Sequence, residues 1–318
     1  MIKVGVIRGG ISKEYDASVS TGATILTHLR DVPLNTKYKA VDIFIDRDGL
    51  WHIGGIPTTM ERVFHSVDIV FNALHGDFGQ DGRLQQLLDQ WHIPYTGSSA
   101  FASALGYNKE LAKGEFDRLG IKTARHILFP AYQKDFDGPL EEYAQKKAKS
   151  VWEKLPPPWV VKPLTGSSSM GIHVCKTYPE LVRAFQVGVN EHVSVIVEEM
   201  IEGKHATVAV ADGFRGQKMY TFPAIEIRGL DSICPGNFSA DEKRELEQLA
   251  VRIHHGLNLD HYSHSDFIVH PRKGIYALQV NTHPEISDES TTQTALSSIG
   301  ASMPDFIAHI IEQARNKK

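Results

Sequence analysis

The chain has 318 residues, of which 42% are hydrophobic and 23% are charged, and its formal net charge is −4. This length predicts two or three domains, the charge gives no reason to expect nucleic acid or an anionic membrane as a partner, and no apolar run approaches the ~20 residues of a membrane span. The two cysteines, Cys175 and Cys234, have neither metal-site spacing nor the pattern of a disulfide framework, which favours a reducing cytoplasm.

The first hundred residues predict a parallel α/β sheet, because short apolar strands alternate with helical stretches. The segment 67–74 is almost continuously apolar, as in a strand that is covered on both faces. We therefore expect an N-terminal α/β domain over residues 1–101. Its elements are predicted as strands 2–7, 41–46 and 67–74 and helices 18–29 and 82–91.

A smaller α+β unit is expected over residues 102–192. Two of its strands flank a loop rich in Ser and Gly, which predicts a hairpin. The elements of this unit are predicted as helices 109–120, 139–155 and 177–189 and strands 159–163 and 171–176.

The remaining residues, 193–318, predict another α+β unit. A strand at 193–200 is expected to form a hairpin with 205–212, and Ser239 and Glu242 have the spacing of a helix capping box. Further elements are predicted as strands 222–227, 262–270 and 274–282 and helix 303–316.

The loop "LTGSSSMG", 164–171, follows a strand that carries Lys162. Backbone N–H groups and hydroxyls of such a loop can hold phosphate oxygens, and the lysine supplies a compact positive charge. The loop lacks the residue order of a Walker A motif, and an ordinary hairpin turn is the simpler alternative. Lys109, at a predicted helix start, is either a ligand-binding residue or a solvated surface lysine.

Two turns follow strands of the first domain, where ligands bind in an open α/β sheet. The turn "LHGDFGQDG", 74–82, contains His75, and the turn "GGISKEYDAS", 9–18, brings Glu14 and Asp16 to a helix N-terminus. An acidic residue there can bind the ammonium group of a substrate. The alternatives are a tight turn in the first case and an acidic residue that complements the helix dipole in the second.

Strands 262–270 and 274–282 are joined by a short turn, so Asp266 can face the same side as Gln279 and Asn281. Mg²⁺ that is bound together with ATP takes oxygen ligands, usually one or two carboxylates besides the phosphates. Asp266 and Asn281 qualify, whereas Gln279 offers a carbonyl oxygen without a charge.

Eight motifs occur in one order along the chain: "GG.S.E....S..TG" (9–22), "LHG..G.DG..Q.LL" (74–88), "IPYTGS" (93–98), "NK..AK" (108–113), "VVKP.....SS.G" (160–171), "EE.I.G...TV.V" (198–210), "DF" (266–267) and "N..P.....S" (281–290). Together they resemble D-alanine–D-alanine ligases of the ATP-grasp superfamily. The resemblance implies a three-domain ATP-grasp fold and a cytoplasmic enzyme of peptidoglycan precursor synthesis. ATP would phosphorylate one D-alanine, and the amine of a second D-alanine or related amino acid would attack the acyl phosphate. The family also implies one or two Mg²⁺ ions and a homodimer, for which helix 18–29 is a plausible contact.

Transferred residue by residue, the resemblance implies that Lys109 and Lys162 bind the ATP phosphates and that Ser168 and Ser169 lie on the phosphate loop. It assigns catalytic roles to Asp16, which would bind the first ammonium group, to Ser168 and to His264. The other implied contacts are Glu198, Glu199, Met200 and Ile201 for adenine, His205 for ribose, Asp266, Gln279 and Asn281 for metal, and His75, Gln80, Glu285 and Ser290 for the amino acids.

Several positions depart from the family pattern, and they concentrate at the implied site. Gln279 replaces a Glu that bridges both metals, which weakens the second metal site, and His264 replaces an Arg that stabilises the oxyanion. Glu285 replaces a Gly of the oxyanion hole. A mobile loop that carries a Lys and a Tyr over the site is missing, since only "RGLDS", 228–232, connects its flanks. Gln80 and His205 each replace a Glu, and Ser167 replaces a Gly.

Three hypotheses remain open on the sequence. The first is an ATP-dependent D-alanine–D-alanine ligase, the second is a weakened or inactive relative that binds nucleotide or a D-amino acid, and the third is a ligase with an altered acceptor. Release of ADP that depends on D-alanine favours the first, nucleotide binding without turnover favours the second, and turnover only with other amines favours the third.

Overall fold

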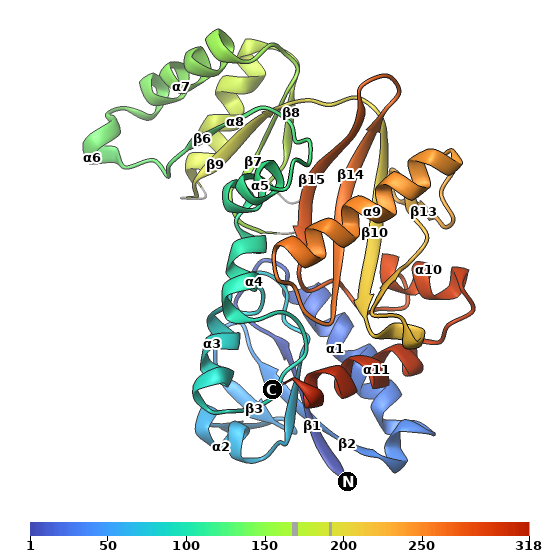
Figure 1. The fold of residues 1–318 in the computed structure, drawn as a ribbon. Helices are drawn as coiled ribbons and strands as arrows, with labels where there is room; N and C mark the ends of the chain where they lie inside the picture. The colour runs from blue at the N-terminus through green and yellow to red at the C-terminus, as the bar shows by residue number, and fades with distance from the viewer. Residues whose placement is uncertain (167–170, 191–192, 318) are drawn as a thin grey trace.

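A computed structural model describes residues 1–166, 171–190 and 193–317. Within these ranges, three β-sheets flanked by helices follow one another along the chain (Figure 1). Two predicted site residues, Ser168 and Ser169, lie outside the described residues. Across the described ranges, every helix is too short or too polar to cross a membrane.

The N-terminal sheet has the strand order β4-β3-β2-β1-β5. The predicted parallel pairing is confirmed, because β1 runs parallel to both β2 and β5, and every residue of β5 is buried. Two short antiparallel strands that the sequence did not predict extend the β2 edge. The elements are β1 (Ile2–Gly9), α1 (Tyr15–Arg30), η1 (Leu34–Thr36), β2 (Tyr38–Ile45), β3 (Trp51–Ile53), β4 (Ile56–Thr58), α2 (Met60–His65), β5 (Ile69–Asn72) and α3 (Arg83–Gln90).

The central sheet has the order β6-β9-β7-β8 with antiparallel neighbours. Its β7–β8 hairpin confirms the predicted pair of strands around the Ser/Gly-rich loop. The elements that follow α3, through the last strand of this sheet, are α4 (Ala100–Tyr107), α5 (Lys109–Arg118), β6 (His126–Phe129), α6 (Lys134–Asp137), α7 (Leu140–Lys154), β7 (Trp159–Pro163), β8 (His173–Cys175), α8 (Tyr178–Asn190) and β9 (Val195–Glu199).

The predicted hairpin between 193–200 and 205–212 is wrong. Strand β9 pairs with β6 and β7 in the central sheet and not with the strand that follows it. Its residues Val195 and Val197 are buried against the helices of that sheet, and this burial outweighs the closeness of the two strands in sequence. By strand pairing, the central sheet therefore extends through Glu199, beyond the predicted limit at residue 192.

The C-terminal sheet has the order β13-β12-β10-β14-β15, and β11 pairs with the far end of β10. The Ser239–Glu242 capping box is confirmed at the start of α9, and β14 and β15 form the predicted antiparallel pair. The elements are β10 (Lys204–Asp212), η2 (Phe214–Gly216), β11 (Met219–Thr221), β12 (Ile225–Arg228), β13 (Asp231–Ile233), α9 (Ala240–Gly256), β14 (Tyr262–His270), β15 (Gly274–Asn281), α10 (Thr291–Ser298) and α11 (Met303–Asn316).

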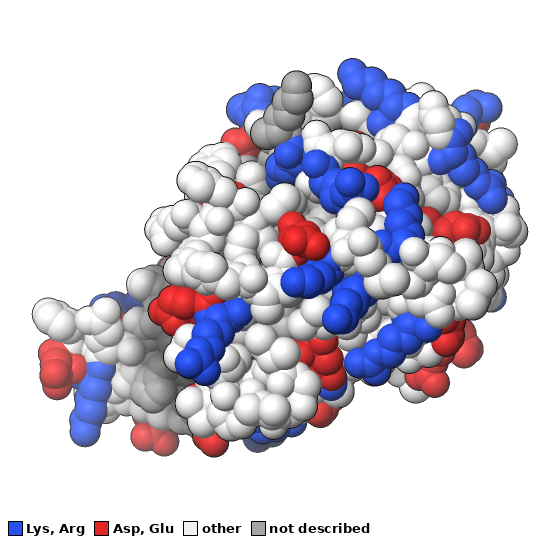
Figure 2. Space-filling view, turned by 90° about the horizontal axis from the view of Figure 1, so that it is seen from below, with Lys and Arg blue, Asp and Glu red and all other residues white. Residues whose placement is uncertain are grey.

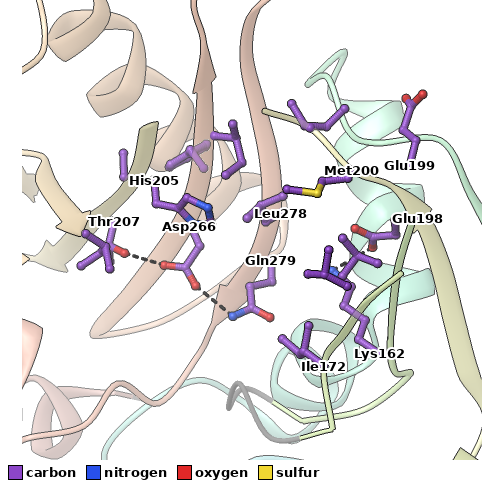
Figure 3. Close-up of a pocket in the computed structure, with 17 residues that line it drawn as sticks. Lys162, Ile172, Glu198, Glu199, Met200, His205, Thr207, Asp266, Leu278 and Gln279 are labelled. Carbon is purple, nitrogen blue, oxygen red and sulfur yellow. Dashed lines mark hydrogen bonds and ion pairs between the residues drawn. The ribbon is translucent and has the colours of Figure 1, made fainter. Parts of the chain in front are cut away.

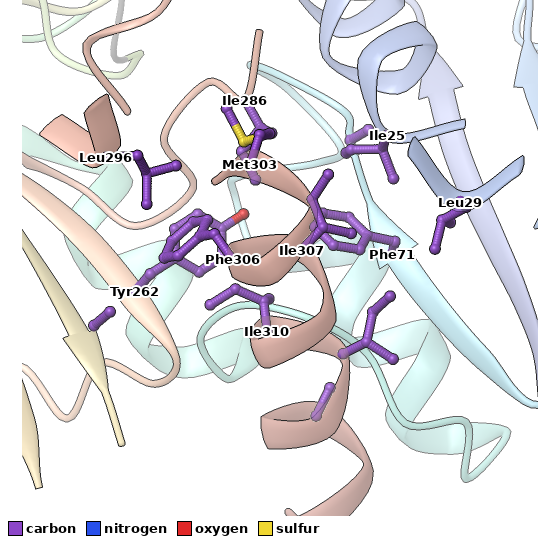
Figure 4. Close-up of a cluster of buried hydrophobic side chains, with 14 of the residues drawn as sticks. Ile25, Leu29, Phe71, Tyr262, Ile286, Leu296, Met303, Phe306, Ile307 and Ile310 are labelled. Atoms are coloured by element: carbon purple, nitrogen blue, oxygen red, sulfur yellow. The ribbon is translucent and has the colours of Figure 1, made fainter. Parts of the chain in front are cut away.

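Helix α11 joins the N-terminal and C-terminal sheets through one apolar core (Figure 4). Phe306 and Tyr262 pack edge to face on the side of the C-terminal sheet, with ring centroids 5.9 Å apart. Ile307 belongs to the same cluster as Ile25 and Phe71 of the N-terminal unit. Burial of this apolar surface fixes the two units against each other, so groups on the loops of one are held at a constant place relative to the other.

The outer surface carries charges of both signs. Figure 2 shows one face of the molecule on which lysines and arginines are interspersed with aspartates and glutamates. Such an arrangement keeps a protein soluble without creating a large field of one sign on that face.

Candidate active site

A cavity of about 450 Å³ lies between the central and C-terminal sheets (Figure 3). Lys162 and Glu198 line the central side, and Asp266 and Gln279 face them from the C-terminal sheet. An apolar cleft with charged groups near one end suits a planar base that is attached to phosphates. Apolar side chains complete much of the wall, among them Val160, Ile172, Val174, Ile227, Ile268 and Leu278.

Glu198 is the centre of a buried group of charges. Its Oε1 lies 2.8 Å from Lys162 Nζ and 3.2 Å from Lys113 Nζ. Burial acts to raise the pKa of Glu198, but Lys162 and Lys113 outweigh burial and hold the pKa below its usual value. Glu198 is therefore an ionised carboxylate that partly balances the lysines, in addition to lining the predicted adenine cavity.

Lys109 is buried, which excludes the surface-lysine alternative. Asn108 caps α5 with its side chain and so places Lys109 in the first helical turn. Lys109 Nζ donates a hydrogen bond of 2.6 Å to the carbonyl oxygen of Gly166, where the predicted phosphate loop begins. Burial and, next, the neighbouring Lys162 lower the pKa of Lys109 to about 7. A phosphate beside it would restore its full charge.

The end of β9 and the residues that follow it line the cavity, as predicted for the adenine contacts. Glu199, Met200 and Ile201 all line the cavity. The Glu199 carboxylate is turned to Arg125 at 2.8 Å, and the backbone N–H of Met200 donates to the carbonyl of Pro158. These contacts fix the course of the backbone. His205 lines the same cavity from an exposed position on β10.

The predicted metal-binding residues lie on neighbouring strands. Asp266 pairs in register with Thr207 on β10 and with Gln279 on β15. Thr207 Oγ1 donates to one Asp266 carboxylate oxygen at 2.7 Å, and Gln279 Nε2 donates to the other at 2.9 Å (Figure 3). The Gln279 amide thus meets Asp266 with its nitrogen, where a second metal-binding carboxylate would present oxygen.

The donor set fits one Mg²⁺ better than two. Asp266 supplies one carboxylate, and Asn281 supplies an amide oxygen that accepts from the His283 backbone N–H at 2.9 Å and from Gln80 Nε2 at 3.3 Å. One carboxylate, one amide oxygen and phosphate oxygens satisfy the usual Mg²⁺ pattern. The described residues contain no group of three or more His, Cys, Asp or Glu side chains arranged to hold a metal by themselves. Phosphate oxygens of a nucleotide would have to complete such a site.

His264 provides a neutral group at the predicted acyl-transfer position. It is buried on β14, and burial lowers its pKa to about 4. Its Nδ1 lies 3.3 Å from the hydroxyl of Thr291 at the start of α10. At neutral pH the imidazole can act as a hydrogen-bond donor or acceptor but not as a permanent cation.

His75 and Gln80 lie together at the carboxyl end of β5. His75 is hydrogen-bonded to Thr21 at 2.9 Å, and burial, followed by the neighbouring His283, lowers its pKa to about 3. Gln80 accepts from the Gly76 backbone N–H at 3.0 Å and donates to the His283 carbonyl at 3.1 Å. The pair therefore links the turn after β5 to the loop after β15 with neutral groups.

Ser290 and Glu285 are held within the loop before α10. The Ser290 hydroxyl donates to the Ser287 carbonyl at 2.7 Å and accepts from the Gln293 backbone N–H as the helix cap. The Glu285 carboxylate accepts from the Ser287 hydroxyl at 2.7 Å. Ser290 thus stands at a helix N-terminus, a favourable place for a substrate carboxylate.

Asp16 is not brought to the site. Its side chain is 92% exposed in the first turn of α1, where it contacts Arg47 at 3.2 Å. Glu14 precedes the helix and lines a cavity of about 230 Å³ together with Gly76 and Tyr107. Glu14, and not Asp16, is therefore the acidic residue of this turn that faces a cavity. The motif "GG.S.E" contained this signal, because Glu14 is its acidic residue.

Two residues at the site carried no predicted role. Thr207 orients Asp266, and Lys113 shares Glu198 with Lys162. Lys113 was visible in the sequence as the second lysine of "NK..AK", one helical turn after Lys109. Thr207 left no such signal, because its role depends on the pairing of β10 with β14.

The connection between β12 and β13 is a tight hairpin. Arg228 pairs with Asp231, which leaves Gly229 and Leu230 as the turn, and Leu230 is fully exposed. The family's mobile loop has no counterpart in this turn, in agreement with the sequence.

A Ser–His–Asp arrangement occurs outside the cavity. His254 Nδ1 lies 2.8 Å from the Ser263 hydroxyl, and His254 Nε2 lies 3.3 Å from the Asp212 carboxylate. Ser263 and His254 are each 1% exposed, so a substrate cannot reach the hydroxyl. The three residues tie α9 to β10 and β14 and satisfy polar groups inside the core.

Solved structures share the architecture. The D-Ala:D-Ser ligase VanG from Enterococcus faecalis superposes with a TM-score of 0.82 at 23% identity, covering 98% of this chain and 99% of that one. The D-alanine–D-alanine ligase from Bacillus anthracis complexed with ATP gives a TM-score of 0.80 at 24% identity, covering 99% and 97%. The three sheets with a cavity between the second and third therefore define an ATP-grasp fold.

Sequence comparison identifies the family. The family model "D-ala D-ala ligase C-terminus" matches residues 118–312, and "D-ala D-ala ligase N-terminus" matches residues 55–98. The D-alanine–D-alanine ligase of Geotalea uraniireducens is 30% identical over 99% of this chain and 96% of its own length. The chain belongs to the D-alanine–D-alanine ligase family.

Proposed function

We propose that this chain is an ATP-dependent ligase that joins D-alanine to a second D-alanine or a related amino acid in peptidoglycan precursor synthesis. The observation that carries the proposal is that Lys162 and Asp266 line one nucleotide-sized cavity from opposite sheets, while the buried Lys109, close enough to Lys162 to feel its charge, binds the Gly166 carbonyl at the predicted phosphate loop. Membership of the ligase family supplies the reaction type. The cytoplasm is the proposed location, because ATP is available there.

The reaction consumes one ATP for each amide bond. A carboxylate oxygen of the first amino acid takes the γ-phosphoryl group and ADP leaves. The amine of the second amino acid then attacks the acyl carbon, loses a proton and expels inorganic phosphate. Lys109 and Lys162 hold the phosphates, and Asp266 and Asn281 are the residues that would hold Mg²⁺, with Gln279 as an uncharged third donor. The bound metal would neutralise phosphate charge during the transfer.

The amino acids are proposed to bind where the N-terminal turns meet the loop before α10. Glu14 would hold the ammonium of the first amino acid, and Ser290 would hold the carboxylate of the second. His75, Gln80 and Glu285 would shape this end, and His264 would donate a hydrogen bond to the developing oxyanion. Predicted roles of Ser168 and Ser169 on the phosphate loop remain part of the proposal.

A second candidate is a relative that binds nucleotide but turns over slowly or not at all. It is favoured by the contact of Gln279 Nε2 with Asp266 and by the two-residue turn between β12 and β13. A missing metal carboxylate leaves phosphate charge uncompensated, and a missing lid exposes an acyl phosphate to water.

The test measures ADP release from MgATP with and without D-alanine, in the unaltered protein and in Gln279→Glu. Release that depends on D-alanine in the unaltered protein supports the ligase. If only Gln279→Glu turns over, one missing charge is the defect and the second candidate holds. The matched control is Gln217→Glu, the same change at an exposed position after η2; equal gains in both variants would argue against a role for Gln279.

A homodimer is part of the proposal and is tested separately. Helix α1 is the proposed contact, since part of it remains exposed while its other face packs on β1 and α11. Sedimentation equilibrium that gives the mass of one chain at micromolar concentration would reject this part of the proposal.

A further inference from the structure

The buried charges around Glu198 are not balanced. Lys109, Lys113 and Lys162 are each less than a tenth exposed, and Glu198 is the buried carboxylate among them. Ionised, the four groups carry a net charge of +2, from three ammonium groups and one carboxylate. Among the described residues, Glu14 also acts on Lys109, and Asp117 also acts on Lys113. A buried excess of positive charge is costly unless an anion joins it.

The two lysines that share Glu198 occupy different sides of it. Lys162 lines the nucleotide cavity, as Glu198 does, whereas Lys113 on α5 does not belong to the lining. Both ammonium groups approach the same carboxylate oxygen, at 2.8 Å and 3.2 Å. Lys113 therefore approaches Glu198 from outside the cavity, at a point that a ligand in the cavity does not contact.

Helix α5 carries two buried lysines with different targets. Lys109 and Lys113 are four residues apart and so lie on one helical face. Lys109 reaches the Gly166 carbonyl at the phosphate loop, whereas Lys113 reaches Glu198. The helix thus supplies one cation to the carbonyl of Gly166 and a second cation to the carboxylate that holds Lys162.

When a nucleotide binds, Lys162 can pair either with Glu198 or with the phosphate oxygens. Phosphate oxygens attract its ammonium group, but leaving Glu198 without a cation would strand a buried carboxylate, which is strongly unfavourable. A second lysine on the same oxygen removes this penalty. We propose that Lys113 is a positioning residue that keeps Glu198 paired while Lys162 moves from Glu198 to the nucleotide phosphates. This inference rests on the proposed use of ATP at this cavity.

The role differs from simple stabilisation of the core. If Lys113 only filled space, its loss would weaken the fold and all ligands of the cavity alike. If Lys113 releases Lys162, loss of Lys113 should weaken the binding of ligands with phosphates. Binding of adenosine should not change, because adenosine has no phosphate for Lys162 to contact. Removing Glu198 as well then frees Lys162 again, so the double variant regains phosphate binding.

The experiment measures the dissociation constants of ATP, ADP and adenosine by calorimetry in the whole protein, for Lys113→Met, for Lys113→Met with Glu198→Gln, and for the unaltered chain. Lys113→Met is expected to weaken ATP and ADP about 10- to 100-fold and to change adenosine by less than about twofold. The double variant is expected to recover ATP binding to within about fivefold of the unaltered protein. Lys149→Met, an exposed lysine on α7, is the control and is expected to change nothing.

Two further measurements keep the inference open to rejection if Lys113→Met folds poorly. Lys113→Arg keeps the charge and should bind ATP about as well as the unaltered protein. Glu198→Gln alone leaves three buried lysines that phosphate can compensate, so ATP is expected to raise the Tm of this variant by more than it raises that of the unaltered protein. Unchanged ATP affinity in a folded Lys113→Met, an equal loss for adenosine, or no recovery in the double variant would each overturn the role of Lys113. An unaltered protein that binds no ATP would overturn the proposed function itself.

Discussion

The two ends of the proposed site differ in how they handle charge. At the nucleotide end, three buried lysines and one carboxylate form a dense ionic group on α5, β7 and β9. At the acceptor end, His75, Gln80 and His264 are buried and neutral. The first end attracts an anion strongly, whereas the second relies on hydrogen bonds. The nucleotide end is thus better suited to holding an anion than the acceptor end is to stabilising a new charge.

The largest expected effect falls where the two ends meet. Asp266→Asn removes the one carboxylate among the predicted metal-binding residues and leaves three amide side chains, at positions 266, 279 and 281. ADP release with MgATP and D-alanine should therefore fall at least about 100-fold. Steady-state turnover measures it, with Asp48→Asn in an exposed turn as the control. Full turnover in Asp266→Asn would mean that no metal binds between the two ends.

The next effect is a pH dependence of ATP binding at the nucleotide end. Lys109 has a folded pKa of about 7, so it is charged below that pH and neutral above it. The dissociation constant for ATP should therefore rise by up to about tenfold per pH unit above 7, until the higher pKa of the bound state is reached. Calorimetry from pH 6 to pH 9 measures this rise, and the slope should be lost in Lys109→Met. A flat profile in the unaltered protein would contradict the titration of Lys109.

A small effect is expected at the acceptor end. Because burial already keeps His264 neutral, His264→Asn should change turnover by less than about threefold, since both side chains can donate one hydrogen bond. The pH profile between 6 and 8 should be the same in both proteins. Turnover that rises below pH 6.5 in the unaltered protein and not in the variant would show that His264 does carry charge.

The smallest effect lies outside both ends. Tyr38 and Lys37 both contact Glu312 on α11, and although burial acts to raise the pKa of Glu312, these contacts lower it to about 2. A depressed carboxyl pKa stabilises the fold above the unfolded value, near 4.5, and the gain is lost as pH falls towards 2. Glu312→Gln should lower Tm by about 1–4 °C at pH 7. Glu153→Gln on an exposed part of α7 should not, and equal Tm changes would reject the assignment.

The sequence predicted the strands with the strongest periodicity and the pairs that are close in the chain. The parallel arrangement around β1, the β7–β8 and β14–β15 hairpins and the capping box of α9 all follow from local pattern. The hairpin between β9 and β10 failed because burial against α7 and α8 selected a different partner for β9. Local pattern identifies a strand, but it does not identify the sheet that the strand enters.

The site residues likewise divide into those that the sequence identified and those that only the structure placed. Lys162 and Asp266 could be proposed from the residues alone, because a lysine before a Gly/Ser loop and a carboxylate on a strand have the same chemistry in any fold. Lys109 needed the family resemblance, because its sequence neighbourhood also fitted a surface lysine. Exposure distinguishes Asp16 from Glu14, which are only two positions apart: Asp16 faces solvent, whereas Glu14 lines a cavity.

The sequence by itself determined the family, the order of the elements and which charged groups the chain contains. Only the tertiary structure decided which of those groups are buried together. It placed Lys113 and Lys162 on one oxygen of Glu198, and it gave Asp266 the partners Thr207 and Gln279 from two other strands. Ionisation and hydrogen bonding depend on neighbours and solvent access, and a folded chain sets both through contacts between residues that are distant in sequence.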